Sequence, residues 1–144
     1  MLTSDPSPPW STEVHIPSSY SAGKPVLDRL LAELQRAKWP EQDIFGVHLA
    51  VEEALINAIM HGNRMDKSKR VRIAYRLQPD RLSIEIVDEG SGFDPEGVPD
   101  PTQPDNRYSP SGRGVLLMRN FMSRVEFSDR GKRVVMEKLR GPAQ

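Results

Sequence analysis

The chain has 144 residues, a length that suits one domain with a proper hydrophobic core. Its 20 Lys and Arg residues balance its 20 Asp and Glu residues, and this zero net charge argues against a protein held to nucleic acid by bulk charge. The absence of cysteine excludes a disulfide framework, cysteine-based zinc sites and thiol catalysis.

The two ends of the chain are predicted to be tails around one domain, 12–140. Residues 1–11 are rich in Pro and Ser, and they lack the basic start and apolar core of a signal peptide. Residues 141–144 form the second tail. No apolar run approaches the roughly 20 residues that cross a bilayer, so we expect a cytoplasmic protein without a membrane segment.

The first part of the domain is predicted to be a strand followed by two helices. Residues 12–17 alternate weakly, as a short edge strand does. Apolar residues recur at helical spacing from about Ser21 to Lys38, with charged residues on the other side. Trp39-Pro40 breaks this helix, and a second one with an apolar stripe runs from Pro40 to the stop signal Gly62-Asn63.

The second part is predicted to contain four strands, one helix and a long loop. The strands are expected at 71–77, 82–87, 125–129 and 133–139, and the helix is expected at 111–122. The stretch from about 94 to 111 carries five prolines, and a loop of this length in a small domain indicates a mobile lid over a ligand. This order of elements predicts an α/β two-layer sandwich, with a mixed, mostly antiparallel sheet and helices on one face.

The second predicted helix carries candidate binding residues. Glu53, Asn57 and His61 are spaced by four, so they lie along one side of the helix. A buried Glu and Asn need partners, because leaving such groups unpaired costs on the order of 1–3 kcal/mol. Magnesium and phosphates would supply these partners, since an amide oxygen is a hard ligand suited to Mg²⁺. The alternative is a solvated polar face.

A second candidate is the end of the strand 82–87. Asp88 follows this strand and precedes Gly90 and Gly92. The carboxylate can accept a hydrogen bond, and the glycines let a flat ligand approach the main chain. The alternative is an ordinary turn, since Asp and Gly suit turns.

Three segments together resemble the three boxes of the GHKL ATPase superfamily, in order and rough spacing. They are Glu53-x-x-x-Asn57, Asp88-x-Gly90-x-Gly92 and Gly112-x-Gly114. Within that superfamily, the segments from Glu53 to Gly62 and from Ser111 to Met122 are most similar to the small anti-sigma factor serine kinases. The resemblance covers roughly residues 12–140.

The resemblance implies ATP and Mg²⁺ as the ligands of the site. Asp88 would accept the amino group of adenine, and Gly90 and Gly92 would shape the adenine pocket. Asn57 would bind the Mg²⁺ that bridges the phosphates. His61 would either hydrogen-bond near the phosphates or cap the helix.

The resemblance also implies how the phosphates are held and transferred. Gly112 and Gly114 would wrap them at a helix N-terminus, where free N–H groups and the helix dipole favour anions. We also expect Arg113, between these glycines, to reach a phosphate, a role that follows from its position and not from the family motif. Glu53 would act as general base on the incoming hydroxyl. Glu52 lies about 100° away around the helix, so we expect it to be solvated.

The sequence departs from the superfamily at one point. Many members place a Thr or Ser on the strand after the last helix, where its hydroxyl helps to hold a water beside the adenine. The segment Gly131–Met136 has no hydroxyl. A backbone group or Ser128 would have to support Asp88 instead.

The resemblance implies a bacterial anti-sigma factor with serine/threonine kinase activity. Such a protein sequesters a sigma factor and phosphorylates an anti-anti-sigma partner, without touching nucleic acid directly. One alternative is a nucleotide-dependent switch that binds a partner without transferring phosphate, against which the retention of Glu53 and Asn57 argues. Another is a detached ATP-binding domain of a histidine kinase. A homodimer through the exposed edge of the first strand stays open.

Overall fold

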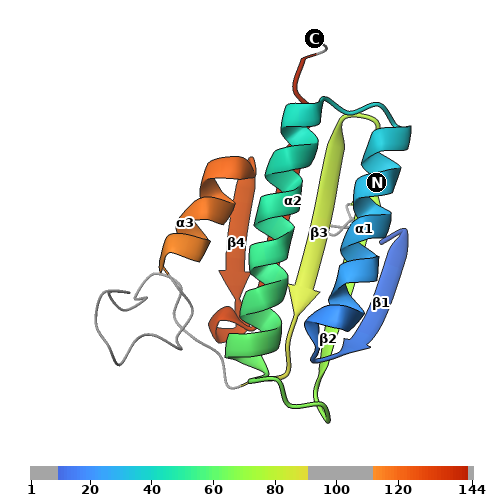
Figure 1. Cartoon of the computed structure of the whole chain (residues 1–144). Helices are drawn as coiled ribbons and strands as arrows, with labels where there is room; N and C mark the ends of the chain where they lie inside the picture. The colour runs from blue at the N-terminus through green and yellow to red at the C-terminus, as the bar shows by residue number, and fades with distance from the viewer. Residues whose placement is uncertain (1–9, 91–111, 143–144) are drawn as a thin grey trace, which may run out of the picture.

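A five-stranded sheet forms one layer of the fold, and three helices cover one of its faces (Figure 1). The computed structural model describes residues 10–90 and 112–142. The strands are β1 (Thr12–Pro17), β2 (Arg70–Leu77), β3 (Arg81–Val87), β4 (Arg124–Ser128) and β5 (Arg133–Leu139). The helices are α1 (Tyr20–Arg36), α2 (Glu41–Ile56) and α3 (Gly112–Phe121). The predicted two-layer sandwich is confirmed.

The strands follow the order β1-β2-β3-β5-β4, and all four pairings are antiparallel in the part of the chain that the structure describes. The last two strands therefore do not follow the order of the chain: β5 pairs with β3, and β4 lies at the edge of the sheet. In the middle of the sheet, Ile84 lies opposite Tyr75 on one side and Met136 on the other. Residues that lie directly opposite one another on neighbouring strands point to the same face of a sheet, so these three apolar residues share a face.

Helix α1 begins and ends at recognisable local signals. The side chain of Ser19 caps its N-terminus by accepting a hydrogen bond from the N–H of Ala22, at 3.2 Å. Lys38 adopts a left-handed conformation, with φ of 62°, directly after the helix. Such a residue ends a helix because its carbonyl no longer follows the helical path. The observed bounds lie within two residues of the predicted ones.

Helix α2 lies against α1 and α3 and continues into a short π-helix, η1 (Asn57–Gly62). Together they form the one segment of the described chain with the length and hydropathy of a membrane-spanning helix. Half of that segment is buried inside the fold, and Glu52 and Glu53 interrupt its apolar character. This is the packing of a core helix.

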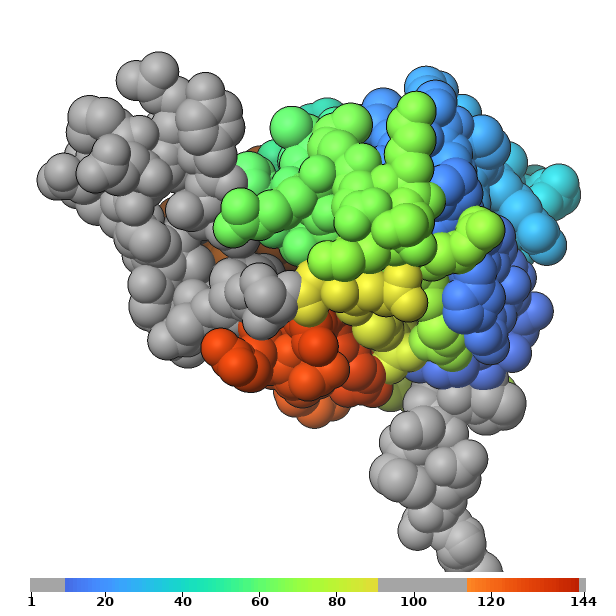
Figure 2. All heavy atoms as spheres, turned by 90° about the horizontal axis from the view of Figure 1, so that it is seen from below, coloured from blue at the N-terminus to red at the C-terminus, as the bar shows by residue number. Residues whose placement is uncertain are grey.

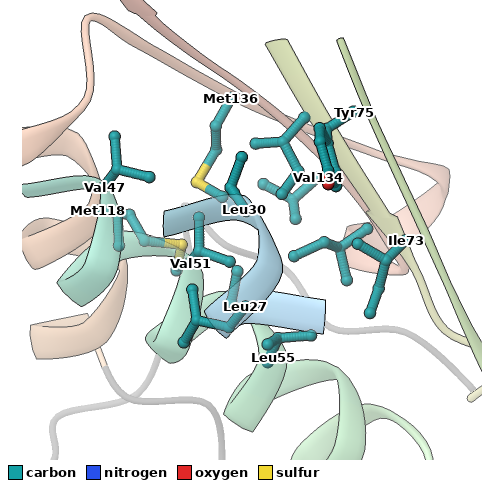
Figure 3. Close-up of a cluster of buried hydrophobic side chains, with 14 of the residues drawn as sticks. Leu27, Leu30, Val47, Val51, Leu55, Ile73, Tyr75, Met118, Val134 and Met136 are labelled. Carbon is teal, nitrogen blue, oxygen red and sulfur yellow. The ribbon is translucent and has the colours of Figure 1, made fainter. Parts of the chain in front are cut away.

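The core fills the space between the helices and the sheet (Figure 3). Leu30 of α1, Val51 and Leu55 of α2, Met118 of α3 and Met136 of β5 are among its fully buried members. Burying a side chain of this size contributes roughly 1.5–3 kcal/mol relative to leaving it in water. The core thus fixes α2 and α3 relative to β3, and these three elements carry the sequence motifs.

Candidate active site

The first two motifs meet at the end of the sheet where β3 stops. Figure 2 views the molecule from this end, where the segment after η1, the end of β3 and the β4–β5 turn lie side by side. A pocket opens between them. Its walls include Asn57 and Ala58 of η1, Ile86 and Asp88 at the end of β3, and Gly131 and Lys132 of the turn.

Asp88 is buried in this pocket, with 6% of its surface exposed. Its Oδ1 accepts a hydrogen bond from the N–H of Gly90 at 2.8 Å, and its own N–H donates to the carbonyl of Lys132 at 2.9 Å. Burial raises the pKa of the carboxyl to about 6, although the Gly90 hydrogen bond and the charge of Lys132 oppose this rise. A carboxylate with one hydrogen bond retains acceptor capacity for a ligand.

The end of η1 lies in backbone contact with the end of β3. A Cβ atom at Gly90 would overlap the carbonyl of Gly62, and a Cβ at Gly62 would overlap the carboxylate of Asp88. Gly90 was predicted to let a ligand approach the main chain, and in the structure it is η1 that approaches. Gly92 and the predicted lid 94–111 lie outside the described residues.

Asn57 is the first residue of η1 and is buried, with 6% of its surface exposed. The sequence predicted one α-helix up to Gly62, whereas the last turn is a π-helix in which the N–H of Asn63 reaches the carbonyl of Ala58. Short π-helical turns inside α-helices are frequently found at functional sites. The side-chain nitrogen of Asn57 has no hydrogen-bond partner, which sets it apart from nearly all other described buried side chains.

Glu53 lies one turn before Asn57 and is half-buried. Burial raises the pKa of its carboxyl, the neighbouring Glu52 charge adds to that rise, and the charge of His61 opposes it. Gly114 of α3 lies directly against Glu53: a Cβ there would stand 2.6 Å from Oε2 of Glu53 and 3.9 Å from the side-chain nitrogen of Asn57. The first and third motifs therefore form one surface.

The other residues predicted for the site are Gly112, Arg113 and His61. Gly112 begins α3, and the side chain of Arg113 lies outside the described part of the chain. His61 is half-buried in η1 and acts on Glu53 through its charge. The tail residues 1–9 and 143–144 also lie outside the described residues.

Glu52 was predicted to be solvated, and the structure gives it partners. Its Oε2 accepts a hydrogen bond from the hydroxyl of Tyr20 at 2.7 Å and lies 3.8 Å from Nε2 of His48. Tyr20 is the first residue of α1, so this bond joins the start of α1 to α2. A helical wheel of α2 alone cannot contain such a tertiary contact.

The missing hydroxyl on β5 is not replaced by Ser128. The hydroxyl of Ser128 accepts a hydrogen bond from Arg133 at 3.1 Å on the exposed side of the strand. Asp88 is supported instead by the backbone, through its N–H bond to Lys132.

Sequence reasoning missed a buried polar network beside the pocket. Asn63 is 1% exposed, and its side-chain nitrogen donates to Ser18 Oγ at 2.8 Å and to the carbonyl of Arg70 at 3.0 Å. Its Oδ1 accepts from the N–H of Glu89 at 2.7 Å. The network ties the starts of α1 and β2 to the end of β3. Asn63 reads only as a helix stop in the sequence, because its partners are distant along the chain.

The donor set at Asn57 fits a magnesium ion held mainly by phosphates. The nitrogen and oxygen of a carboxamide are assigned from their surroundings, so a half-turn of the Asn57 amide would present its oxygen where a partner is lacking. No cluster of three His, Cys, Asp or Glu residues is present among the described residues. Mg²⁺ commonly takes one or two protein oxygens and keeps the rest for water and phosphate.

The chain resembles known proteins over most of its length. Residues 16–138 match the histidine kinase-like ATPase domain. The chain is 33% identical over 104 residues to an anti-sigma F factor of Clostridium perfringens, covering 67% of this chain and 73% of that protein. It is 31% identical over 110 residues to the serine-protein kinase RsbW of Bacillus subtilis, covering 72% of this chain and 69% of that protein.

A solved structure shows the same fold. The RsbU and RsbW domains of a Mycobacterium tuberculosis protein match 93% of this chain with a TM-score of 0.60 and 17% identity. The match spans 34% of that longer chain. With residues 16–138 matched, the chain belongs to the family of histidine kinase-like, or GHKL-type, ATPase domains.

Proposed function

We propose that this chain is an ATP-dependent serine/threonine protein kinase that acts as an anti-sigma factor. It would sequester a sigma factor and phosphorylate an anti-anti-sigma partner. The observation that carries the kinase proposal is the position of Glu53, a carboxyl of raised pKa, against Gly114 at the N-terminus of α3. The similar proteins named anti-sigma F factor and serine-protein kinase supply the partner class.

The nucleotide would lie with its base at Asp88 and its phosphates at α3. Asp88 offers a carboxylate acceptor for the amino group of adenine, inside a pocket that also has apolar walls such as Ile86. The N-terminal turn of α3 contains Gly114 and lies beside Glu53, and the N–H groups of such a turn favour phosphate charge. Asn57 would hold Mg²⁺, which supplies charge neutralisation on the phosphates.

Glu53 would serve as the base in transfer. Its carboxylate takes the proton of a Ser or Thr hydroxyl, the hydroxyl oxygen forms a bond to the γ-phosphorus, and the bond from that phosphorus to the bridging oxygen of ADP breaks. A raised pKa suits this role, because a base is most effective when its pKa lies near the operating pH. The other residues position the reactants, which is most of what phosphoryl transfer requires.

The experiment is transfer of label from γ-labelled ATP with Mg²⁺ to a purified anti-anti-sigma protein from the same genome. Wild type should label Ser or Thr. Glu53→Gln should lose transfer by at least a hundredfold while binding ATP as wild type does. Glu41→Gln, an exposed position on the same helix, is the matched control and should transfer normally.

Each alternative function corresponds to a distinct outcome of this experiment. Label on His instead of Ser or Thr would make the chain a detached histidine-kinase domain. ATP binding without transfer to any acceptor would make it a nucleotide-dependent binding switch. Unchanged transfer by Glu53→Gln would remove Glu53 as the base.

We also propose that the protein acts in the cytoplasm, where sigma factors act. We further propose that two copies pair through the open edge of β1.

A further inference from the structure

The turn between β4 and β5 forms one wall of the pocket beside Asp88, and the backbone of this turn is unusual. Asp129, Arg130 and Gly131 follow one another in the left-handed region, with φ of 52°, 58° and 86°. That conformation costs roughly 1–2 kcal/mol for each residue that carries a side chain. Backbone held in such regions tends to occur at ligand sites. Here it brings Gly131 and Lys132 into the pocket beside Asp88.

Lys132 is connected to Asp88 through its main chain and through its side chain. Its carbonyl accepts the hydrogen bond of the Asp88 N–H at 2.9 Å, which fixes the backbone at the end of β3. Its side chain is largely enclosed, with 29% exposed, and its Nζ lies 3.9 Å from Oδ2 of Asp129. The ammonium acts on the Asp88 carboxyl through its charge.

We propose that Lys132 is a positioning residue for base recognition: its carbonyl fixes the main chain at Asp88, and its ammonium holds Asp88 as an anionic acceptor for the amino group of the base. This inference rests on the proposed nucleotide binding. Lys132 thereby performs, from the turn, the supporting role that the resemblance assigns to a hydroxyl on β5. Lys132 lies outside all three sequence motifs.

The charges around Asp88 make the role of Lys132 measurable. Burial raises the pKa of Asp88 to about 6, Lys132 and Lys69 lower it, and Asp129 raises it. Lys132 and Asp129 belong to the β4–β5 turn, and Lys69 precedes β2. Protonation of Asp88 removes an acceptor for the base, so affinity should fall as the pH drops through this pKa. Removing Lys132 should move that fall to higher pH.

Two variants of the same turn should therefore have opposite effects. We would titrate the full chain with ATP and Mg²⁺ by calorimetry at about pH 5 and about pH 8. Lys132→Gln should bind about threefold more weakly than wild type at the lower pH and as wild type does at the higher pH, since a rise of about half a unit in the pKa of Asp88 lowers its anionic fraction about threefold well below that pKa. Asp129→Asn should bind more tightly than wild type at the lower pH.

The controls separate charge from structure. Asn tolerates the left-handed conformation that Asp129 adopts, so the turn should persist in Asp129→Asn. Lys132→Arg should restore wild-type binding, and Arg130→Gln, an exposed cation of the same turn, should bind as wild type at both pH values.

Two results would overturn the inference while leaving the proposed function intact. In one, wild type binds ATP and Lys132→Gln weakens binding equally at both pH values, which indicates a purely structural role. In the other, Lys132→Gln and Asp129→Asn shift the pH profile in the same direction or not at all. If wild type binds no ATP at either pH, the proposed function itself fails.

Discussion

Replacing Asp88 with Asn should stabilise the nucleotide-free protein while abolishing its function. Burial raises the pKa of this carboxyl from 3.8 to about 6. The folded state therefore binds the proton more tightly than the unfolded chain, and the free energy of unfolding decreases as the pH rises from the lower value through the higher one. The two pKa values differ by an amount worth about 3 kcal/mol, a cost fully present well above the folded pKa.

Asn keeps the shape of Asp88 and its acceptor for the Gly90 N–H, but it carries no charge. At about pH 7.5 we expect the variant to be about 1–3 kcal/mol more stable than wild type, because the uncharged amide accepts a weaker hydrogen bond and offsets part of the gain. For a domain of this size the melting temperature should rise by about 3 °C for each kcal/mol.

The assay is urea unfolding of both proteins, without nucleotide, at about pH 7.5 and about pH 5. At the lower pH the wild-type carboxyl is mostly protonated, so the difference in stability should shrink by about 1.4 kcal/mol. Calorimetry with ATP should show that Asp88→Asn no longer binds. If the stability difference is the same at both pH values, burial of a charged Asp88 is not its cause, and the reasoning is wrong.

Three further substitutions test the packing of the site. Gly114→Ala places a Cβ 2.6 Å from Oε2 of Glu53, so phosphoryl transfer should fall by roughly a hundredfold in a kinase assay while the melting temperature stays near that of wild type. Gly90→Ala overlaps backbone at the end of η1, and urea unfolding should show a loss of at least about 2 kcal/mol. Asn63→Ala removes three hydrogen bonds, of which the one to Ser18 is buried, and should cost about 2–4 kcal/mol in the same measurement, with native far-UV circular dichroism retained.

The order and type of the elements could be predicted from the sequence because they follow from local periodicity. Apolar residues at helical spacing gave α1 and α2 within a few residues, and alternation gave β2 and β3. The motif residues Glu53, Asn57 and Asp88 could also be selected, because each sits at a fixed place in an element. The fold then brings Asn57 and Asp88 to one pocket and places Glu53 one turn before Asn57.

Most features that sequence reasoning did not predict depend on contacts between distant segments. The pairing of β5 with β3 places the β4–β5 turn beside Asp88, and no local pattern specifies that pairing. Asn63 binds Ser18, which is 45 residues away, and Lys132 binds Asp88 across a similar separation. The left-handed conformation of Asp129 and Arg130 was not predicted either, since neither residue is a glycine.

The unfavourable burial of polar groups is concentrated at the proposed site. Among the described residues, the buried side-chain atoms without a partner are Nε1 of Trp39 and Nδ2 of Asn57, and the carboxyls with raised pKa are Glu53 and Asp88. Three of these four groups belong to the sequence motifs. A fold selected for stability alone would replace them, because unpaired polar groups and desolvated carboxyls each cost free energy. Their retention together is explained if a bound molecule supplies a donor to Asp88, a cation to Asn57 and a hydroxyl proton to Glu53, which is the chemistry of magnesium–ATP with an acceptor hydroxyl.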